Sequence, residues 1–199
     1  MFSEPFYLTS MDPGGITGLV TLRIDKKDFT VERQLGDPYD PLHGKTPART
    51  LKSWAENFRD LPQALLYEDF RLHSQGFVPD PTALNVIGGV ETWLAGTVDV
   101  SSLAPRKAVR AKSSHSRLAD LGGAPGCPYE KVISREPVQR SRKYMVTNAI
   151  LERLGLLAYG PMTTDINDAF RHAVAWLTEQ GYRPVCEQAW PRQRLASPA

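Results

Sequence analysis

The 199-residue sequence lacks the features that mark membrane, secreted and zinc-binding proteins. No window approaches the ~20 consecutive apolar residues that a membrane span requires. The N-terminal stretch MFSEPFYLTS has an acidic residue and no basic one, unlike a signal peptide. The two cysteines, Cys127 and Cys186, are isolated and fit no metal-ligand spacing. We therefore expect a cytoplasmic protein with reduced cysteines, without zinc and without a membrane association.

The composition is that of a folded chain, and its charge is unevenly distributed. Hydrophobic residues make up 41% and charged residues 23%, which argues against disorder. The net charge is only +2, but ten Lys or Arg residues stand against three acids between Pro105 and Met145. This basic middle carries an excess of seven positive charges, so the rest of the chain has a net charge of −5. The pattern predicts a polyanionic partner, with a solvated basic surface as the alternative.

Alternating and apolar segments predict an α/β fold with a mixed sheet. An antiparallel three-stranded meander is expected first, followed by an apolar run typical of a parallel strand covered on both faces. The expected strands are residues 6–11, 17–24, 29–35, 62–70 and 97–105. Helices are expected at residues 47–58, 81–96, 139–157 and 165–180, and a long surface segment at 112–138. We expect one domain over residues 1–182 and a flexible tail over 183–199.

Carboxylates stand where two of the predicted strands end. Asp12 ends the first strand and is followed by Pro-Gly-Gly, and Glu68 and Asp69 end the fourth. If these strands pair in parallel, the carboxylates reach the same edge of the sheet, where ligands bind in open α/β folds. Asp12 as a plain turn residue, and Glu68 or Asp69 as a solvated strand end, are the alternatives.

The last predicted helix adds further titratable side chains. Asp165 and Asp168 are three residues apart and share one helix face, and His172 follows four residues later. Asp165 as the N-cap, with Asp168 at the third helical position, is the alternative. A cluster of carboxylates repels itself unless a cation neutralises it, and carboxylate oxygens are the ligands that Mg²⁺ and Mn²⁺ prefer.

Three motifs carry a resemblance to a known family. MDPGGITG, LLYEDF and DINDAFRHA resemble, in this order, the acidic motifs of RuvC-type Holliday-junction resolvases of the ribonuclease H-like superfamily. The resemblance implies a ribonuclease H-like fold and an endonuclease of DNA recombination and repair that resolves four-way junctions by paired nicks as a homodimer. It implies that two Mg²⁺ ions, or Mn²⁺ ions, are held by four acids, which are Asp12, Glu68, Asp165 and Asp168. Asp69 is the less favoured alternative to Glu68. The resemblance implies that His172 orients a carboxylate or the water. A half-buried helix histidine without such a role is the alternative.

The resemblance also directs attention to the basic middle. The family places a basic residue after its fifth strand, which here favours Lys107 as a catalytic cation. Six further side chains are expected on nucleic-acid phosphates: Arg106, Arg110, Lys112, Arg140, Arg142 and Lys143. Gly14 and Gly15 would leave room for a phosphate beside Asp12. A dimer interface is expected on residues 82–94, through Val86, Val90, Trp93 and Leu94, with a core role for this stripe as the alternative.

Other functions stay open at this point. One is another nuclease of the same fold, acting on flaps or on RNA/DNA hybrids. A second is a non-catalytic nucleic-acid-binding module. The stretch DPGGITG also resembles the first phosphate loop of actin-like ATPases and sugar kinases, although 199 residues leave little room for their second lobe.

Overall fold

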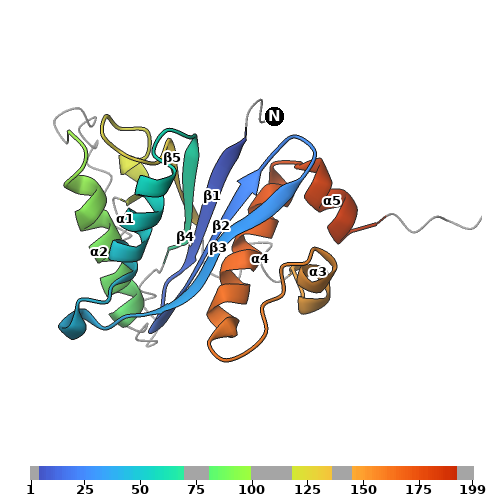
Figure 1. Cartoon of the computed structure of the whole chain (residues 1–199), viewed down its shortest axis with the longest axis horizontal. Helices are drawn as coiled ribbons and strands as arrows, with labels where there is room; N and C mark the ends of the chain where they lie inside the picture. The colour runs from blue at the N-terminus through green and yellow to red at the C-terminus, as the bar shows by residue number, and fades with distance from the viewer. Residues whose placement is uncertain (1–4, 70–80, 100–117, 136–144, 192–199) are drawn as a thin grey trace, which may run out of the picture.

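The computed structural model describes residues 5–69, 81–99, 118–135 and 145–191, and it is built on a five-stranded sheet (Figure 1). The strands stand in the order β3-β2-β1-β4-β5. They are β1 (Phe6–Asp12), β2 (Ile16–Ile24), β3 (Phe29–Pro38), β4 (Gln63–Glu68) and β5 (Lys131–Arg135). The first three form an antiparallel meander, and β4 and β5 continue the sheet in parallel with β1. This confirms the expected mixed sheet, in which an antiparallel three-stranded meander is joined to parallel strands.

Helices cover both faces of the sheet (Figure 1). One face is covered by α1 (Pro47–Asn57), α2 (Pro81–Ala95) and the short 3₁₀ helix η3 (Leu118–Leu121), and the 3₁₀ helix η1 (Pro41–His43) follows β3. The other face is covered by α3 (Asn148–Arg153), α4 (Thr163–Glu179) and α5 (Arg183–Ala189). In the part of the chain that the structure describes, no helix is long and apolar enough to cross a membrane.

The two helical layers create two hydrophobic cores, one on each side of the sheet. Phe6 and Leu8 of β1 pack in the core with α4, whereas Met11 packs in the core with α1 and α2. The same alternation along β4 sends Leu66 to the α4 side and Tyr67 to the other. Because successive side chains of a strand point to opposite faces, the position of each residue in the strand decides which helix it meets.

The fifth strand lies elsewhere in the sequence than expected. Residues 97–99 form a turn after α2 rather than the start of a strand, and residues 100–105 lie outside the described part. The sheet is instead completed by β5 (Lys131–Arg135), within the segment predicted to be a surface loop. β5 is a short edge strand with one buried residue, Val132, so it has a weak hydrophobic pattern, and pairing with β4 is what makes it a strand.

Three further predictions also need correction. The helix predicted over residues 139–157 is reduced to α3 (Asn148–Arg153) in the described part of that range. The predicted tail begins too early, because α5 (Arg183–Ala189) buries Val185 and Ala189 in the core with α4. The stripe offered as a dimer interface belongs to the core. Val86, Val90 and Leu94 of α2 are at most 1% exposed, and Trp93 is partly buried against the same core on the α1 side of the sheet.

Candidate metal centre

Asp12 and Glu68 are neighbours at one edge of the sheet. Strands β1 and β4 pair in parallel up to Met11 and Tyr67, and Asp12 and Glu68 are the next residue of each strand. Both follow the alternation that sends Leu8 and Leu66 to the α4 side, so both carboxylates lie beneath α4. The sequence prediction that these two acids meet is confirmed by this geometry.

Asp69 points away from this pair. Its side chain accepts a hydrogen bond from the Ser134 hydroxyl of β5 at 3.2 Å, and its backbone N–H donates to the carbonyl oxygen of Arg135 at 2.8 Å. Ser134 is paired with Tyr67, whose side chain lies in the core with α1 and α2. One residue along the strand therefore reverses the face, which leaves Glu68 as the strand-end acid beside Asp12.

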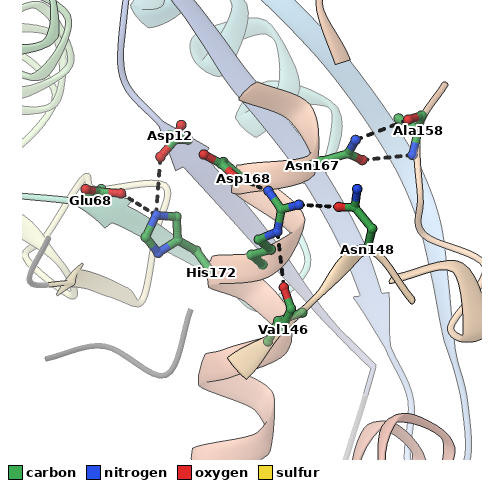
Figure 2. Close-up of polar contacts among 9 residues, drawn as sticks. Asp12, Glu68, Val146, Asn148, Ala158, Asn167, Asp168 and His172 are labelled. Atoms are coloured by element: carbon green, nitrogen blue, oxygen red, sulfur yellow. Dashed lines mark hydrogen bonds and ion pairs between the residues drawn. The ribbon is translucent and has the colours of Figure 1, made fainter. Parts of the chain in front are cut away.

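His172 of α4 joins the two carboxylates. Its Nε2 lies 2.6 Å from Oε2 of Glu68 and 3.3 Å from Oδ1 of Asp12 (Figure 2). One ligand atom from each of the three residues lies within 4.8 Å of the others, and among the described residues this is the one group of three or more potential metal ligands. The imidazole is fully buried, so the alternative of a half-buried helix histidine is wrong. Its Nδ1 has no hydrogen-bond partner among the described residues. Nε2 is therefore the nitrogen through which His172 acts on the cluster.

The turn after β1 has polar contacts that come from Thr17. The Thr17 hydroxyl donates to the carbonyl oxygen of Gly14 at 3.3 Å and lies 3.5 Å from the Gly14 N–H. Thr17 thus supplies polar contacts inside the turn, while the Asp12 side chain reaches His172 across the interface with α4. A role for Asp12 as a plain turn residue does not explain that direction.

Two glycines on neighbouring strands, aligned across the sheet with Asp12, allow helix α4 to pack closely against the sheet. Gly18 is paired with Asp12, and Gly36 is paired with Gly18. A Cβ on Gly18 would lie 1.9 Å from the carbonyl oxygen of Asp165, and one on Gly36 would lie 3.0 Å from that of Met162. The first turn of α4 therefore rests directly on the sheet backbone beside Asp12.

Asp165 and Asp168 both lie in the first two turns of α4. The helix begins at Thr163 after Met162, which has a positive φ of 64°, so Asp165 is the third helical residue and its alternative role as N-cap is wrong. Asp168 lies one helical turn before His172 on α4, and its carboxylate forms an ion pair with Arg171. The structure thus brings Asp168 to the edge of the cluster, whereas the tight group of potential ligands is Asp12, Glu68 and His172.

Arg171 is the polar residue of this region that sequence reasoning missed. Its NH1 group forms an ion pair with Oδ1 of Asp168, its NH2 group donates to Oδ1 of Asn148, and its Nε donates to the carbonyl oxygen of Val146 at 3.1 Å. The spacing of three residues between Asp168 and Arg171 was the available signal, because such pairs are neighbours on a helix surface.

The residues present fit a divalent cation. Asp12 and Glu68 provide the carboxylate oxygens that Mg²⁺ and Mn²⁺ prefer. The imidazole of His172 either adds one neutral nitrogen ligand for the cation or donates a hydrogen bond that orients the two carboxylates. Two adjacent carboxylates that are shielded from bulk water repel each other and destabilise the fold unless a cation or a hydrogen-bond donor lies between them. In this site the carboxylates of Asp12 and Glu68 are such a pair.

The predicted phosphate contacts and the predicted catalytic cation lie outside the described residues: Arg106, Lys107, Arg110, Lys112, Arg140, Arg142 and Lys143. The role of Lys107 therefore stays a prediction. Lys107 was selected because it follows the expected fifth strand, and the observed fifth strand is Lys131–Arg135. In the sequence, Arg140, Arg142 and Lys143 are the basic residues that follow this strand.

Comparison with known proteins finds similarity among solved structures. No family model and no curated protein sequence matches the chain. Among solved structures, the chain is similar to T. thermophilus RuvC in complex with Holliday junction substrate. That match has 16% sequence identity and a TM-score of 0.47, and it covers 89% of this chain and 97% of the other. The function of the chain is therefore inferred from the geometry of the site itself.

Proposed function

We propose that the protein is a divalent-metal-dependent nuclease that cleaves branched DNA, with the four-way junction as its substrate. The observation that carries this proposal is the convergence of Asp12, Glu68 and His172, from two strand ends and a distant helix, within 4.8 Å. The three acidic sequence motifs support the same chemistry, because each contributes a residue to this corner of the fold. Carboxylates grouped in this way are typical of metal-assisted phosphodiester hydrolysis.

The protein residues have separable tasks under this proposal. A bound cation supplies Lewis acidity and a more acidic water. Asp12 and Glu68 hold the cation, and Asp165 and Asp168 extend the negative surface along the first two turns of α4. His172, when Nε2 carries its proton, donates to Glu68 and Asp12 and so fixes the orientation of both carboxylates.

The turn after β1 leaves access to this site. A Cβ added to Gly15 would meet no atom within 4 Å. Among the described residues, the space at Gly15 is therefore open, and we expect a phosphate group to approach Asp12 there. The basic residues of the middle segment would contact the other phosphates of the DNA without reading its sequence.

Two symmetric cuts across a four-way junction require two active sites, and a homodimer provides them. We retain the homodimer as part of the proposal. Its interface is not the Val86, Val90 and Leu94 stripe, because those side chains are already buried within the protomer. A measurement of molar mass in solution, with and without junction DNA, tests this point.

The decisive experiment compares four DNA substrates with one variant. Purified full-length protein is incubated with Mg²⁺ or Mn²⁺ and with a four-way junction, a flap, an RNA/DNA hybrid and a linear duplex. Paired symmetric nicks in the four-way junction are expected. Asp12→Asn is expected to reduce cleavage by about 10³-fold, because a metal ion contributes several kcal/mol to transition-state stabilisation. Junction binding by this variant should be largely retained.

Asp60→Asn is the matched control, since Asp60 is exposed in the turn after α1. It should cleave like the unaltered protein. Cleavage confined to flaps or hybrids would instead identify another nuclease of this fold. Binding of branched DNA without any cleavage by the unaltered protein would identify a non-catalytic binding module and refute the proposal.

A further inference from the structure

Arg171 is held on all three of its guanidinium nitrogens. It bridges Asp168 on its own helix to Val146 and Asn148, which precede and begin α3. Its side chain is 21% exposed, and that of Asp168 is 28% exposed. A planar guanidinium with three partners in different directions has one orientation, which a lysine ammonium cannot reproduce.

The partners of Arg171 are themselves fixed. Val146 is 1% exposed and lies in the core with α4, so the carbonyl oxygen that accepts from Nε belongs to an anchored segment. Asn148 is the first residue of α3, where the backbone N–H groups of Ile150 and Leu151 donate to the carbonyl oxygen of Thr147. The guanidinium is therefore positioned by the α3 region rather than by Asp168 alone.

We propose that Arg171 is a positioning residue for Asp168, an inference that depends on the proposed metal-dependent function. By holding Oδ1 of Asp168, Arg171 keeps this partly exposed carboxylate in a single orientation, one helical turn before His172. The positive charge also offsets the repulsion among Asp168, Asp12 and Glu68 before a cation binds. Arg171 thereby reduces the cost of assembling the acidic site, and its effect reaches the cation through Asp168.

Metal affinity, rather than DNA affinity, should report this role. Mn²⁺ binding is measured on the full-length protein without DNA, by titration calorimetry or electron paramagnetic resonance. Arg171→Gln is expected to weaken Mn²⁺ binding by about 10- to 100-fold, the usual effect of removing a partner that orients a metal ligand. Arg171→Lys keeps the positive charge but lacks the planar guanidinium group. Its Mn²⁺ affinity should therefore lie between those of Arg171→Gln and the unaltered protein. In cleavage assays, kcat at low metal should fall and should recover at high metal, while KM for DNA stays unchanged.

Three further variants make the test specific. Asn148→Ala removes one anchor of the guanidinium at an exposed position and should weaken Mn²⁺ binding by a smaller factor in the same direction. Asp168→Asn and the double variant with Arg171→Gln should bind Mn²⁺ equally, because Arg171 acts through Asp168. Arg183→Gln is the control, since it removes an exposed ion pair with Glu187 on α5 and should leave Mn²⁺ binding unchanged.

The outcomes separate this proposal from the proposed function. If the unaltered protein binds no Mn²⁺ and cleaves nothing, the metal-dependent function itself fails. If it binds Mn²⁺ and Arg171→Gln or Arg171→Lys binds equally well but unfolds at a lower temperature, Arg171 is only a tether between α4 and α3, and the positioning role is refuted. Additive losses in the double variant would refute the route through Asp168.

Discussion

The substitution Gly18→Ala tests how closely the candidate site depends on the seating of α4. Gly18 is the cross-strand partner of Asp12, and it lies under the first turn of the helix that carries Asp165, Asp168 and His172. A Cβ at this position would stand 1.9 Å from the carbonyl oxygen and 2.3 Å from the carbonyl carbon of Asp165. Both neighbours are backbone atoms, so no side-chain rotation relieves the contact.

The size of the effect follows from this distance. Ordinary contact begins at 3.4 Å, so the first turn of α4 must move by about 1.5 Å relative to β2. Overpacking of this kind costs roughly 1–3 kcal/mol. In a chain of this length, 1 kcal/mol corresponds to about 2–4 °C in Tm, so a decrease of roughly 4–8 °C is expected for a cost of about 2 kcal/mol. A displacement of about 1 Å in a catalytic group can reduce the rate by about 10²-fold, so kcat should fall at least that far.

The assay combines thermal unfolding with cleavage of a four-way junction at a temperature where the variant is folded. Gly88→Ala is the matched control, because a Cβ on this exposed glycine of α2 would meet no atom within 4 Å. It should cleave normally and gain about 0.5–1 kcal/mol in stability from higher helix propensity. If Gly18→Ala retains both the original Tm and the original kcat, α4 is not seated on β2 as described, and the explanation of the site is wrong.

Two further predictions concern the strand end and the C-terminal layer. Glu68→Gln should lose cleavage by at least about 10²-fold, whereas Asp69→Asn, which faces Ser134 on the other side of the sheet, should keep a near-normal rate; the reverse order in a junction-cleavage assay would refute the assignment by strand face. Tyr182 donates its hydroxyl to the carbonyl oxygens of Asp28 and Asp25, and burial together with the charges of these two acids raises its pKa to about 12. The folded state therefore holds this proton more tightly than the unfolded state, so the stabilisation is complete below about pH 10 and is lost as the pH rises toward 12. Tyr182→Phe should lower the stability at pH 7 by about 1 kcal/mol, and urea unfolding between pH 9 and 12 should show a shallower loss than in the unaltered protein.

Much of the sheet was predictable because its central strands carry strong local patterns. The meander and the buried run of β4 (Gln63–Glu68) were placed within a few residues of their observed bounds, and the parallel pairing of β1 with β4 was expected from the chain order. The acidic motifs then brought Asp12 and Glu68 to one edge. The periodicity of α4 also separated its apolar face from the acids, although the helix begins two residues earlier than expected.

Other features had only a weak or ambiguous local signal. The hydrophobic pattern of β5 (Lys131–Arg135) is weak, so the sequence favours residues 97–105 as the fifth strand. That choice in turn favours Lys107, which follows those residues, as the catalytic cation. The sequence does not decide whether His172 is buried, because a histidine near two aspartates on a helix has the same local pattern whether it faces solvent or the core. Arg171 was missed because its partners Val146 and Asn148 are 25 and 23 residues away along the chain.

The sequence by itself determined which residue types are available and where the four central and meander strands form, since side-chain alternation and buried apolar runs are properties of neighbouring residues. It also determined that acids end two strands and begin a helix. Only the tertiary structure decided that Glu68 rather than Asp69 faces Asp12, that His172 lies between them, and that Arg171 holds Asp168. These are contacts between distant segments, and their geometry depends on strand register and on how closely α4 rests on Gly18, neither of which any local stretch of sequence specifies.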